Sequence, residues 1–346
     1  MQVRRIGSTL LALICLMICL GCDQGRDSKL EERRARLGKE QPLRVGWLAS
    51  VPIHAQVIQA LKHTSILEQH GIIASFHSFS FGSPEVEAAL AGELDVLFVG
   101  DQPFVNLYAK DPAWKIVGRM MYGRVTLMVP NQSPIKTIAD LRGKRVASAF
   151  GSVAHRDVVL WQQAAGLDPR KDVTNINLDI LEILNLVQRG GDWGGLDAAM
   201  TWDPGAAIIE VKDGARVIKQ ARVTMVISMP QRLLDQSPQL ARRFLSAVRD
   251  GWAYYATHQK QANAWYEAEV RKQFGDEILQ RVAASEPNMQ ARNSDEVDLS
   301  FSSDDLKSLQ TSADWALEMG LATSKMDMSS SIDLRFLERD TRETVG

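Results

Sequence analysis

The chain has 346 residues, of which 45% are hydrophobic and 24% charged, a composition typical of a soluble globular protein long enough for two lobes with separate cores. Its formal net charge is −2. Without the first 21 residues, which carry two arginines and no acid, 38 basic and 42 acidic side chains leave a balance of about −4. This balance indicates no nucleic-acid partner. The three cysteines are Cys15, Cys19 and Cys22, so the rest of the chain offers neither a disulfide nor a cysteine metal site.

Residues 1–21 have the pattern of a secretory signal peptide. Arg4 and Arg5 precede the almost wholly apolar residues 6–20, a stretch that fits the hydrophobic region of a signal peptide better than a transmembrane span. The segment ends in Cys19-Leu20-Gly21-Cys22, which resembles a bacterial lipobox, although Cys19 stands where leucine is usual. The resemblance implies lipidation at Cys22. An ordinary signal peptide that is cleaved elsewhere is the alternative.

Residues 22–42 are expected to form a lipidated tether. They are rich in charge and nearly free of large apolar groups, so they cannot bury enough surface to fold alone. Asp23 directly follows Cys22 and resembles the signal that keeps enteric-type lipoproteins at the inner membrane. We therefore expect a protein anchored at Cys22 on the periplasmic face of the inner membrane.

From residue 43 onward the chain alternates between strand and helix patterns. Short apolar runs at 43–48, 72–81 and 94–99 predict strands, and the apolar spacing at 55–69 predicts a helix. A further helix is predicted to begin at Ser83-Pro84, because serine is a favoured cap and proline a favoured first residue. This alternation predicts an α/β protein with a largely parallel sheet.

Two internal similarities predict that the fold has two related lobes. LDVLFVGDQP (94–103) resembles LDAAMTWDPG (196–205), and RVTLMVP (124–130) resembles RVTMVISMP (222–230). Chance similarity between short strands is the alternative. A second lobe inserted into the first would make the last two runs a hinge of two strands, around which the lobes could close on a ligand. The predicted parts are lobe 1 at 43–125 and 226–322, lobe 2 at 126–225, and a tail at 323–346.

Gly151-Ser152 is the most informative of the strand ends, where ligands of open α/β sheets bind. Residues 145–150 predict a strand and residues 153–165 a helix, so Ser152 would be the helix cap. The free amides and the dipole of the first helical turn form an anion site, to which Arg156 would add a cation. A plain cap, with His155 and Arg156 exposed, is the alternative.

The same run contains the residue types of a hydrolase triad but not the required geometry. His155 and Asp157 are two positions apart on the predicted helix, so their side chains diverge. Ser152 is not part of a G-x-S-x-G turn. The six histidines are scattered, and none lies in an H-E-x-x-H motif. We therefore predict no catalytic residues, no metal and no cofactor.

Other strand ends offer further candidate residues. Asp101 and Asp203 would either bind a donor group of the ligand or cap the helices that follow them. Trp202 would cover an apolar part of the ligand. His54, at a predicted helix start, would either contact the ligand or be an ordinary, partly buried histidine.

Four motifs resemble, in this order, those of periplasmic solute-binding proteins of the nitrate/sulfonate/taurine (NMT1-like) class: RVGWLAS (44–50), GSPEVEAALAGELDVLFVGDQP (82–103), IADLRGKRVASAFGS (138–152) and TWDP (201–204). The resemblance implies a type II periplasmic-binding-protein fold, with two α/β lobes joined by a two-strand hinge. It also implies a binding protein without enzymatic activity that delivers its solute to the permease and ATPase subunits of an ABC importer. We expect a monomer.

The ligands of this class include sulfonates, taurine, nitrate, aromatic acids and vitamin precursors, so the resemblance implies a small anionic or zwitterionic organic solute. In the class, anionic groups meet helix N-termini and hydroxyl groups at positions that match Ser50, Ser83 and Ser152, and His155 and Arg156 would tune ligand choice. Two alternatives are an enzyme on the same fold that acts on a small acid or vitamin precursor, and a ligand-sensing adaptor lipoprotein. The predicted ligand-binding residues are Ser50, Val51, His54, Gly82, Ser83, Asp101, Gln102, Gly151, Ser152, His155, Arg156, Trp202 and Asp203.

Overall fold

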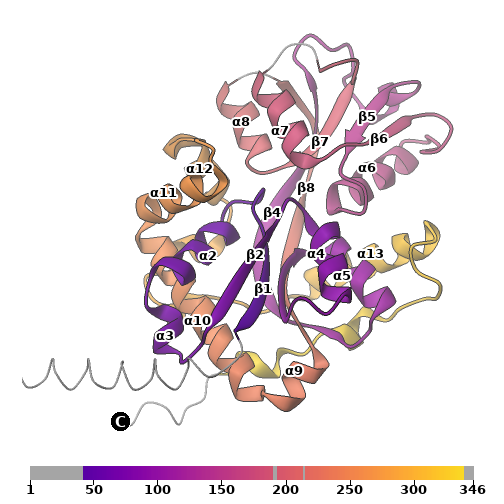
Figure 1. Cartoon of the computed structure of the whole chain (residues 1–346). Helices are drawn as coiled ribbons and strands as arrows, with labels where there is room; N and C mark the ends of the chain where they lie inside the picture. The colour runs from indigo at the N-terminus through magenta and orange to yellow at the C-terminus, as the bar shows by residue number, and fades with distance from the viewer. Residues whose placement is uncertain (1–41, 190–192, 213–214, 339–346) are drawn as a thin grey trace, which may run out of the picture.

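The computed structural model describes residues 42–189, 193–212 and 215–338 (Figure 1). The predicted signal peptide, Cys22 and all but the last residue of the predicted tether lie outside this part, as do the last eight residues of the predicted tail. Among the described residues, no helix has the length and apolar character needed to cross a bilayer. In the same part of the chain, no group of three or more His, Cys, Asp or Glu side chains is arranged to hold a metal ion.

An eight-stranded sheet runs through the described molecule in the order β2-β1-β3-β8-β4-β7-β5-β6. β1 is parallel to β2 and β3, and β5 is parallel to β6 and β7. The predicted α/β class is confirmed, but the sheet is mixed, because β4 and β8 run antiparallel to each other and to their outer neighbours. The strands are β1 (Leu43–Leu48), β2 (Ala74–Phe79), β3 (Val96–Gly100), β4 (Trp114–Pro130), β5 (Arg145–Ser148), β6 (Thr174–Asn177), β7 (Ala198–Trp202) and β8 (Ala215–Pro230).

Helices cover the two halves of the sheet separately (Figure 1). β3 and β7 are buried along their whole length, as expected for short apolar strands covered on both faces. The half with β1–β3 carries α2 (His54–His63), α3 (Ile66–Gln69), α4 (Gly82–Leu90) and α5 (Asp101–Lys110), and the half with β5–β7 carries α6 (Val153–Ala164), α7 (Ile180–Arg189) and α8 (Gly205–Lys212).

Most of the C-terminal helices return to the half that contains β1–β3, whereas α12 contacts α8 of the other half. α10 packs against α2, and α13 packs against α5. α10 does so because Phe244, Val248, Trp252 and Tyr255 recur at helical spacing on its buried face. These helices are α9 (Gln231–Gln236), α10 (Pro238–Thr257), α11 (Gln259–Val270), α12 (Asp276–Ala283) and α13 (Ser303–Glu318), and the short 3₁₀ turns are η1 (Ile138–Leu141), η2 (Pro287–Gln290), η3 (Ser294–Glu296), η4 (Met328–Ser331) and η5 (Leu334–Leu337).

β4 and β8, of 17 and 16 residues, form a two-stranded ribbon that joins the two halves. The predicted lobe boundaries at residues 125 and 225 fall within these strands. In an antiparallel ribbon, directly opposed residues point to the same face and successive residues to opposite faces. The front face of this ribbon carries Met121, Gly123, Val223 and Met225, and the back face carries Tyr122, Arg124, Arg222 and Thr224.

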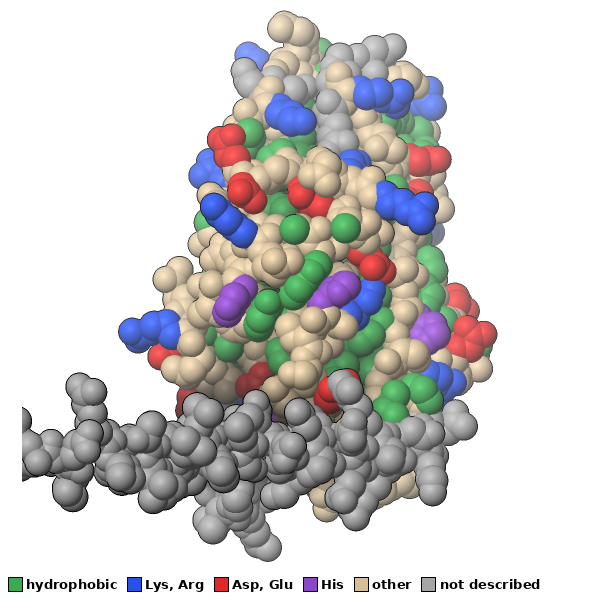
Figure 2. Space-filling view, turned by 60° about the vertical axis from the view of Figure 1, so that its left-hand side comes forward, with side chains coloured by type: hydrophobic (Ala, Val, Ile, Leu, Met, Phe, Trp, Pro, Cys, Tyr) green, Lys and Arg blue, Asp and Glu red, His purple; other side chains and the backbone are tan. Residues whose placement is uncertain are grey.

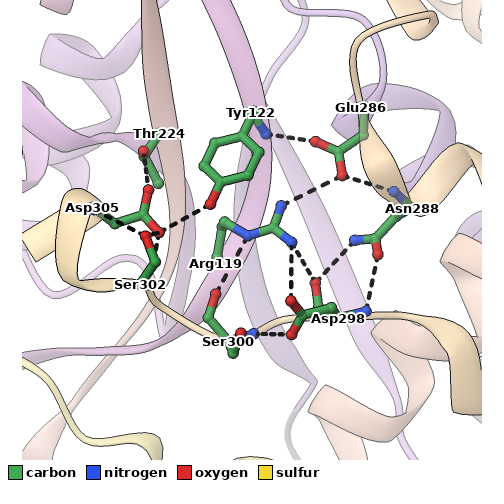
Figure 3. A network of polar contacts seen from close by, with 9 residues as sticks. All are labelled: Arg119, Tyr122, Thr224, Glu286, Asn288, Asp298, Ser300, Ser302 and Asp305. Atoms are coloured by element: carbon green, nitrogen blue, oxygen red, sulfur yellow. Dashed lines mark hydrogen bonds and ion pairs between the residues drawn. The ribbon is translucent and has the colours of Figure 1, made fainter.

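A buried polar network fastens residues 286–305 to the ribbon (Figure 3). The Arg119 side chain is 2% exposed, and it donates to the backbone carbonyls of Asp298 at 2.7 Å and Ser300 at 3.3 Å. Its Nη1 lies 3.4 Å from the fully buried Glu286 carboxylate, which also accepts the backbone N–H of Tyr122 at 2.7 Å. The segment is therefore held to the ribbon by ionic and polar contacts as well as by packing.

Asp305, the first-turn acid of α13, extends this network along the back face. Its carboxylate accepts the Tyr122 hydroxyl at 3.0 Å and the Thr224 hydroxyl at 2.9 Å, so it contacts both strands of the ribbon (Figure 3). The same carboxylate closes a capping box with Ser302 at the start of α13. Asp305 thus stabilises the start of α13 and also holds this helix to the ribbon.

One face of the molecule is charged but not dominated by one sign (Figure 2). On the face shown in Figure 2, acidic and basic side chains are interspersed, and hydrophobic side chains form only small groups. This pattern agrees with the small net charge of the whole chain.

Candidate functional site

A pocket lies above the front face of the ribbon, between the two halves of the sheet. It encloses about 570 Å³ of empty space, part of it open to solvent. We call it the cleft. Its floor consists of the four front-face residues of the ribbon, Met121, Gly123, Val223 and Met225.

Four helix starts surround the cleft. Residues that line it belong to the first turns or caps of α2, α4, α5 and α6: Ile53, Gly82, Gly100 and Ser152. The N-terminus of a helix carries partial positive charge and backbone N–H donors, so four of them around one pocket favour an anionic group there.

The close approach of α4 to α5 requires glycine at one of these starts. A Cβ atom at Gly82 would lie 2.5 Å from the Pro103 side chain, which is closer than side chains tolerate. Gly82 therefore lets the two helix starts share one wall of the cleft.

Ser152 caps α6 as the sequence predicts. Its hydroxyl oxygen accepts the backbone N–H of His155 at 3.4 Å and donates to the carbonyl of Ala149 at 2.6 Å. The imidazole ring of His155 plays no part in this contact, and Asp157 is bonded to the Arg156 side chain at 2.8 Å. The Ser-His-Asp letters of this run therefore do not form a nucleophile-base-acid chain, in agreement with the sequence argument.

Ile53 begins α2 in a backbone conformation that is unusual for its residue type. Its φ of 73° lies in the left-handed region, which a β-branched side chain rarely adopts. Its backbone N–H donates to the side-chain oxygen of Gln56, which holds the turn. Backbone strain of this kind is common at functional sites, and Ile53 lines the cleft.

Trp202 forms a wall of the cleft and links the two halves of the molecule. Its indole Nε1–H donates to the Ser50 hydroxyl at 3.2 Å. Ser50 follows β1 in one half and Trp202 ends β7 in the other, and both are buried. Lobe separation would break this bond.

The cleft lining also includes Arg124 and Asp203, whose charges are already paired. Arg124 Nε donates to Asp203 at 2.8 Å, and its two terminal nitrogens bind Glu210 at 2.6 Å and 3.1 Å. Burial raises the pKa of Asp203, and the hydrogen bond from Arg124 offsets this only in part. Burial acts in the same direction on Glu210, but hydrogen bonds from Arg124 and Arg281 hold the pKa of that carboxyl below its ordinary value. Arg124 is therefore not a free cation in this structure.

Of the thirteen residues predicted to bind the ligand, five line the cleft: Val51, Gly82, Ser152, Trp202 and Asp203. Two others support this lining from behind. Ser50 bonds Trp202, and the Ser83 hydroxyl donates to the Phe150 carbonyl at 3.3 Å across the two halves.

Arg156 and Asp101 do not line the cleft, because they pair with each other beside it. Arg156 is 4% and Asp101 1% exposed, and Nη1 of Arg156 lies 2.8 Å from Oδ1 of Asp101. Arg156 also binds Asp157 at 2.8 Å and the Ser312 hydroxyl of α13. Arg156 was predicted either to bind the ligand or to be exposed beside a plain helix cap, whereas in the structure it is buried and its partners are carboxylates and a hydroxyl.

The remaining predicted residues do not line the cleft, and each has a partner within the protein. His155 stacks on Phe150 at 4.1 Å, and burial lowers its pKa to about 4. His54 is fully buried and accepts the Leu48 N–H at 3.1 Å, and burial lowers its pKa to about 3. The Gln102 side chain bonds Asn106, and the Gly151 carbonyl accepts from Asn106 at 3.1 Å.

The sequence argument missed most of the apolar lining. Val223 and Met225 lie in the run 222–230, which was predicted only as a hinge strand, and Met121 and Gly123 lie just before the other hinge run, 124–130. Their alternation along β4 and β8 was the available signal, because every second side chain of a half-exposed ribbon faces the same pocket. Ile53 and Arg124 gave no comparable signal.

Comparison with known proteins finds similarity to solute-binding proteins. Residues 115–262 match the family model described as NMT1/THI5 like. A putative aliphatic sulfonates-binding protein of Bacillus subtilis (strain 168) is 23% identical over 283 residues, which cover 80% of this chain and 81% of that protein. A protein of the same description from Escherichia coli (strain K12) is 30% identical over 147 residues, covering 42% and 44% of the two chains.

Solved structures extend the similarity to the fold. The periplasmic aliphatic sulphonate binding protein SsuA from Escherichia coli matches with a TM-score of 0.68 at 20% identity, over 85% of this chain and 92% of that one. The family match, the curated relatives and this structure agree, and they confirm the resemblance indicated by the sequence motifs. The chain resembles periplasmic solute-binding proteins of the NMT1/THI5-like class, and it has the periplasmic-binding-protein fold.

Proposed function

We propose that the protein is the solute-binding component of an ABC importer and that it captures a small organic anion with an apolar part, such as an alkanesulfonate, in the cleft. The observation that carries the proposal is the cleft itself, in which four helix starts surround a pocket lined mainly by apolar side chains. The names of the curated relatives, which refer to aliphatic sulfonates, support the same ligand class.

The anionic group would be held mainly by backbone donors. Arg124, the one cation among the described residues of the lining, already binds two carboxylates. The helix starts at Gly82 and Ser152 offer N–H groups and partial positive charge without a competing carboxylate on the same atoms. Such a site suits a singly charged head group better than a multiply charged one.

The apolar part of the ligand would lie on the ribbon. Met121, Met225 and Val223 form the floor and Trp202 one wall, so an alkyl chain would leave water for a mostly apolar surface. Methionine side chains adapt their shape, which favours a set of related chains over a single one. Taurine and nitrate, which the sequence resemblance also allowed, lack this apolar part.

Capture would proceed by lobe closure. In this structure the two halves touch around the cleft through the Trp202–Ser50 and Asn106–Gly151 bonds and the buried Arg156–Asp101 pair. A ligand would therefore enter after these contacts open, with the ribbon acting as the hinge. The permease and ATPase subunits would then receive the solute from the closed form.

A series of ligands tests the proposal. Titration calorimetry would compare straight-chain alkanesulfonates of one to six carbons, the matching carboxylates and the matching alkylammonium ions. We expect affinity to rise roughly fourfold per added methylene, from about 0.8 kcal/mol for each buried CH₂, until the cleft is full. Trp202→Ala should flatten this rise, and Leu321→Ala, an exposed control, should not. Equal binding of alkylammonium ions, no binding at all, or steady consumption of a sulfonate would contradict the proposal.

Membrane anchoring is a separate part of the proposal. The lipobox-like run before Cys22 supports a lipoprotein held at the periplasmic face of the inner membrane. Replacement of Cys22 by alanine should move the protein from the membrane fraction to the soluble periplasmic fraction without changing sulfonate affinity. Retention in the membrane fraction would argue against this anchor.

A further inference from the structure

A second pocket lies against the back face of the ribbon, on the side opposite the cleft floor. It is bounded by β4, β8, α8 and α12, and it encloses about 1030 Å³ of empty space, part of it open to solvent. We call it the back-face pocket. The side chains that give it its character are Tyr122, Arg124, Glu210, Gln220, Arg222 and Arg281.

Two of its arginines stand directly opposite each other on the ribbon. Arg124 of β4, which borders the cleft as well as this pocket, and Arg222 of β8 are register partners, so their side chains leave the same face of the ribbon from adjacent backbone positions. Like charges in this relation repel and destabilise the pair unless an opposite charge compensates them. The arrangement therefore needs an explanation in terms of nearby acids or a bound anion.

The protein's own acids compensate this pocket only in part. Glu210 accepts two hydrogen bonds from Arg124 and one from Arg281 at 2.8 Å. Asp203 accepts the hydrogen bond from Nε of Arg124. Three guanidinium groups thus face two carboxylates. The uncompensated one belongs to Arg222, which is exposed and forms no ion pair with a carboxylate among the described residues.

Arg222 is nevertheless held in place. Its guanidinium group lies 4.3 Å from the centre of the Tyr122 ring, whose hydroxyl is fixed by Asp305. The Asp304 carboxylate interacts electrostatically with Arg222, but it forms its ion pair with Lys307, at 2.9 Å. Arg222 is thus a positioned cation with open donors at the rim of a pocket, which is the usual arrangement for oxyanion recognition by arginine.

From this geometry we infer a second anion-binding site in the back-face pocket, which takes a tetrahedral oxyanion between Arg222 and Arg281. The inorganic ion and the sulfonate or phosphate group of a larger organic molecule present the same oxygens, so both are ligands of the site in chemical terms. Gln220 adds an amide donor at the same pocket wall. The inference does not depend on the ligand of the cleft.

The affinity of this site for an anion would also depend on the arrangement of the two lobes. Arg281 belongs to α12, which follows the second crossing of the ribbon, and Glu210 belongs to α8 in the half with β5–β7. Their bond at 2.8 Å spans the two halves behind the hinge. An anion that binds the closed lobes more tightly than the open lobes must shift the equilibrium toward the closed form. By the same linkage, a ligand that closes the cleft must raise the affinity of the back-face pocket for the anion.

Equilibrium dialysis with radiolabelled sulfate tests the inference on the purified protein. Sulfate would be titrated at constant ionic strength, with chloride as the replacement ion, against the natural protein, Arg222→Gln, Arg222→Lys, Arg281→Gln and the exposed control Lys260→Gln. We expect one saturable site, about tenfold weaker in the two glutamine variants because a charge-assisted contact is lost, and close to natural strength in Lys260→Gln. Arg222→Lys should retain part of the affinity, since it keeps the charge, and this would separate a binding role from a structural one.

Competition distinguishes the two sources of the oxyanion and the two pockets. Displacement of sulfate by phosphate alone identifies an inorganic-ion site, and displacement also by methanesulfonate extends the site to organic groups; either result supports the inference. It would be overturned by the absence of saturable sulfate binding, or by binding that Trp202→Ala abolishes and Arg222→Gln leaves intact, which would place sulfate in the cleft. Alkanesulfonate titration of Arg222→Gln should give natural affinity, so failure of one site is not mistaken for failure of the other.

Discussion

Glu85 shows how a single buried side chain can set the pH range of stability. It lies in the first turn of α4, it is fully buried, and its Oε1 accepts the backbone N–H of Phe98 at 3.2 Å. Its Oε2 has no hydrogen-bond partner among the described residues. Burial raises the pKa of Glu85 well above its ordinary value, and the bond from Phe98 offsets this only in part.

Replacement of Glu85 by glutamine should change the pH dependence of unfolding. The unfolded chain loses the proton near pH 4.5 and the folded chain only at a higher pH, so the folded state binds more protons between these values. Stability therefore falls as pH rises through this window, by about 1.4 kcal/mol per pH unit at most. Glutamine mimics the protonated acid and should remove the slope.

Urea denaturation at pH 4, 6 and 8 would measure this effect. The free energy of unfolding of Glu85→Gln should equal that of the natural protein at pH 4 and exceed it at pH 8. The exposed Glu87 of the same helix provides a matched control, Glu87→Gln, whose profile should follow that of the natural protein. Parallel profiles for all three proteins would show that Glu85 is ionised in the fold and would refute the argument.

At the scale of elements, the ribbon and the segment that covers its back face behave as one unit. The Arg119–Glu286 pair is almost fully buried and has backbone carbonyls and N–H groups as additional partners. Loss of Arg119 leaves the Glu286 carboxylate buried without its cation, which costs about 3–5 kcal/mol, whereas loss of Glu286 leaves Arg119 only the exposed Asp298 carboxylate at 3.8 Å. Replacement of both members removes the uncompensated charge and should cost less than the two single changes together.

A double-mutant cycle tests this coupling. Arg119→Met, Glu286→Leu and the double variant would be compared by guanidinium denaturation, with the exposed pair Arg292–Glu296 as the control cycle. We expect strong coupling in the first cycle and at most about 0.5 kcal/mol in the second. Additive effects in the Arg119 cycle would mean that the two side chains stabilise the fold independently.

The elements also show which parts of the site local sequence could predict. The cap at Ser152 and the alternating strands and helices follow from residues within a few positions of each other, and they appear in the structure at or near the expected residues. The partners of Arg124 lie 79 and 86 positions away, and the Ser312 partner of Arg156 lies 156 positions away. No local pattern encodes such distances, so Arg124 was missed and Arg156 was assigned to the ligand.

At the scale of the whole molecule, the buried Arg156–Asp101 pair joins α6 of one half to α5 of the other. Both groups would be hydrated if the lobes separated, whereas in this structure they are 4% and 1% exposed. Arg156→Met would leave Asp101 and Asp157 buried without their cation. The substitution should then destabilise the closed arrangement by about 3–5 kcal/mol. It should change the stability of the open arrangement little, because a charge exposed to water needs no partner.

Small-angle scattering of the free protein would detect this change. Arg156→Met should have a larger radius of gyration and a weaker affinity for the cleft ligand. Gln163→Ala should have neither, because its bond to Glu318 crosses the same interface at an exposed position. An unchanged radius together with unchanged affinity would show that the pair does not control closure.

The order of strands in the sheet has a consequence for the synthesis of the chain. β3 and β4 are neighbours in sequence, but β8 lies between them in the sheet. Until residue 230 has left the ribosome, each of the two strands lacks a partner on one edge, although β3 is apolar and buried along its whole length and most residues of β4 are buried. Between Gly100 and Ala215 this delay lasts on the order of ten seconds at ordinary rates of synthesis. A nascent chain of this topology must therefore be kept from aggregating, and the same delay keeps it unfolded for any translocation channel that accepts only unfolded polypeptide.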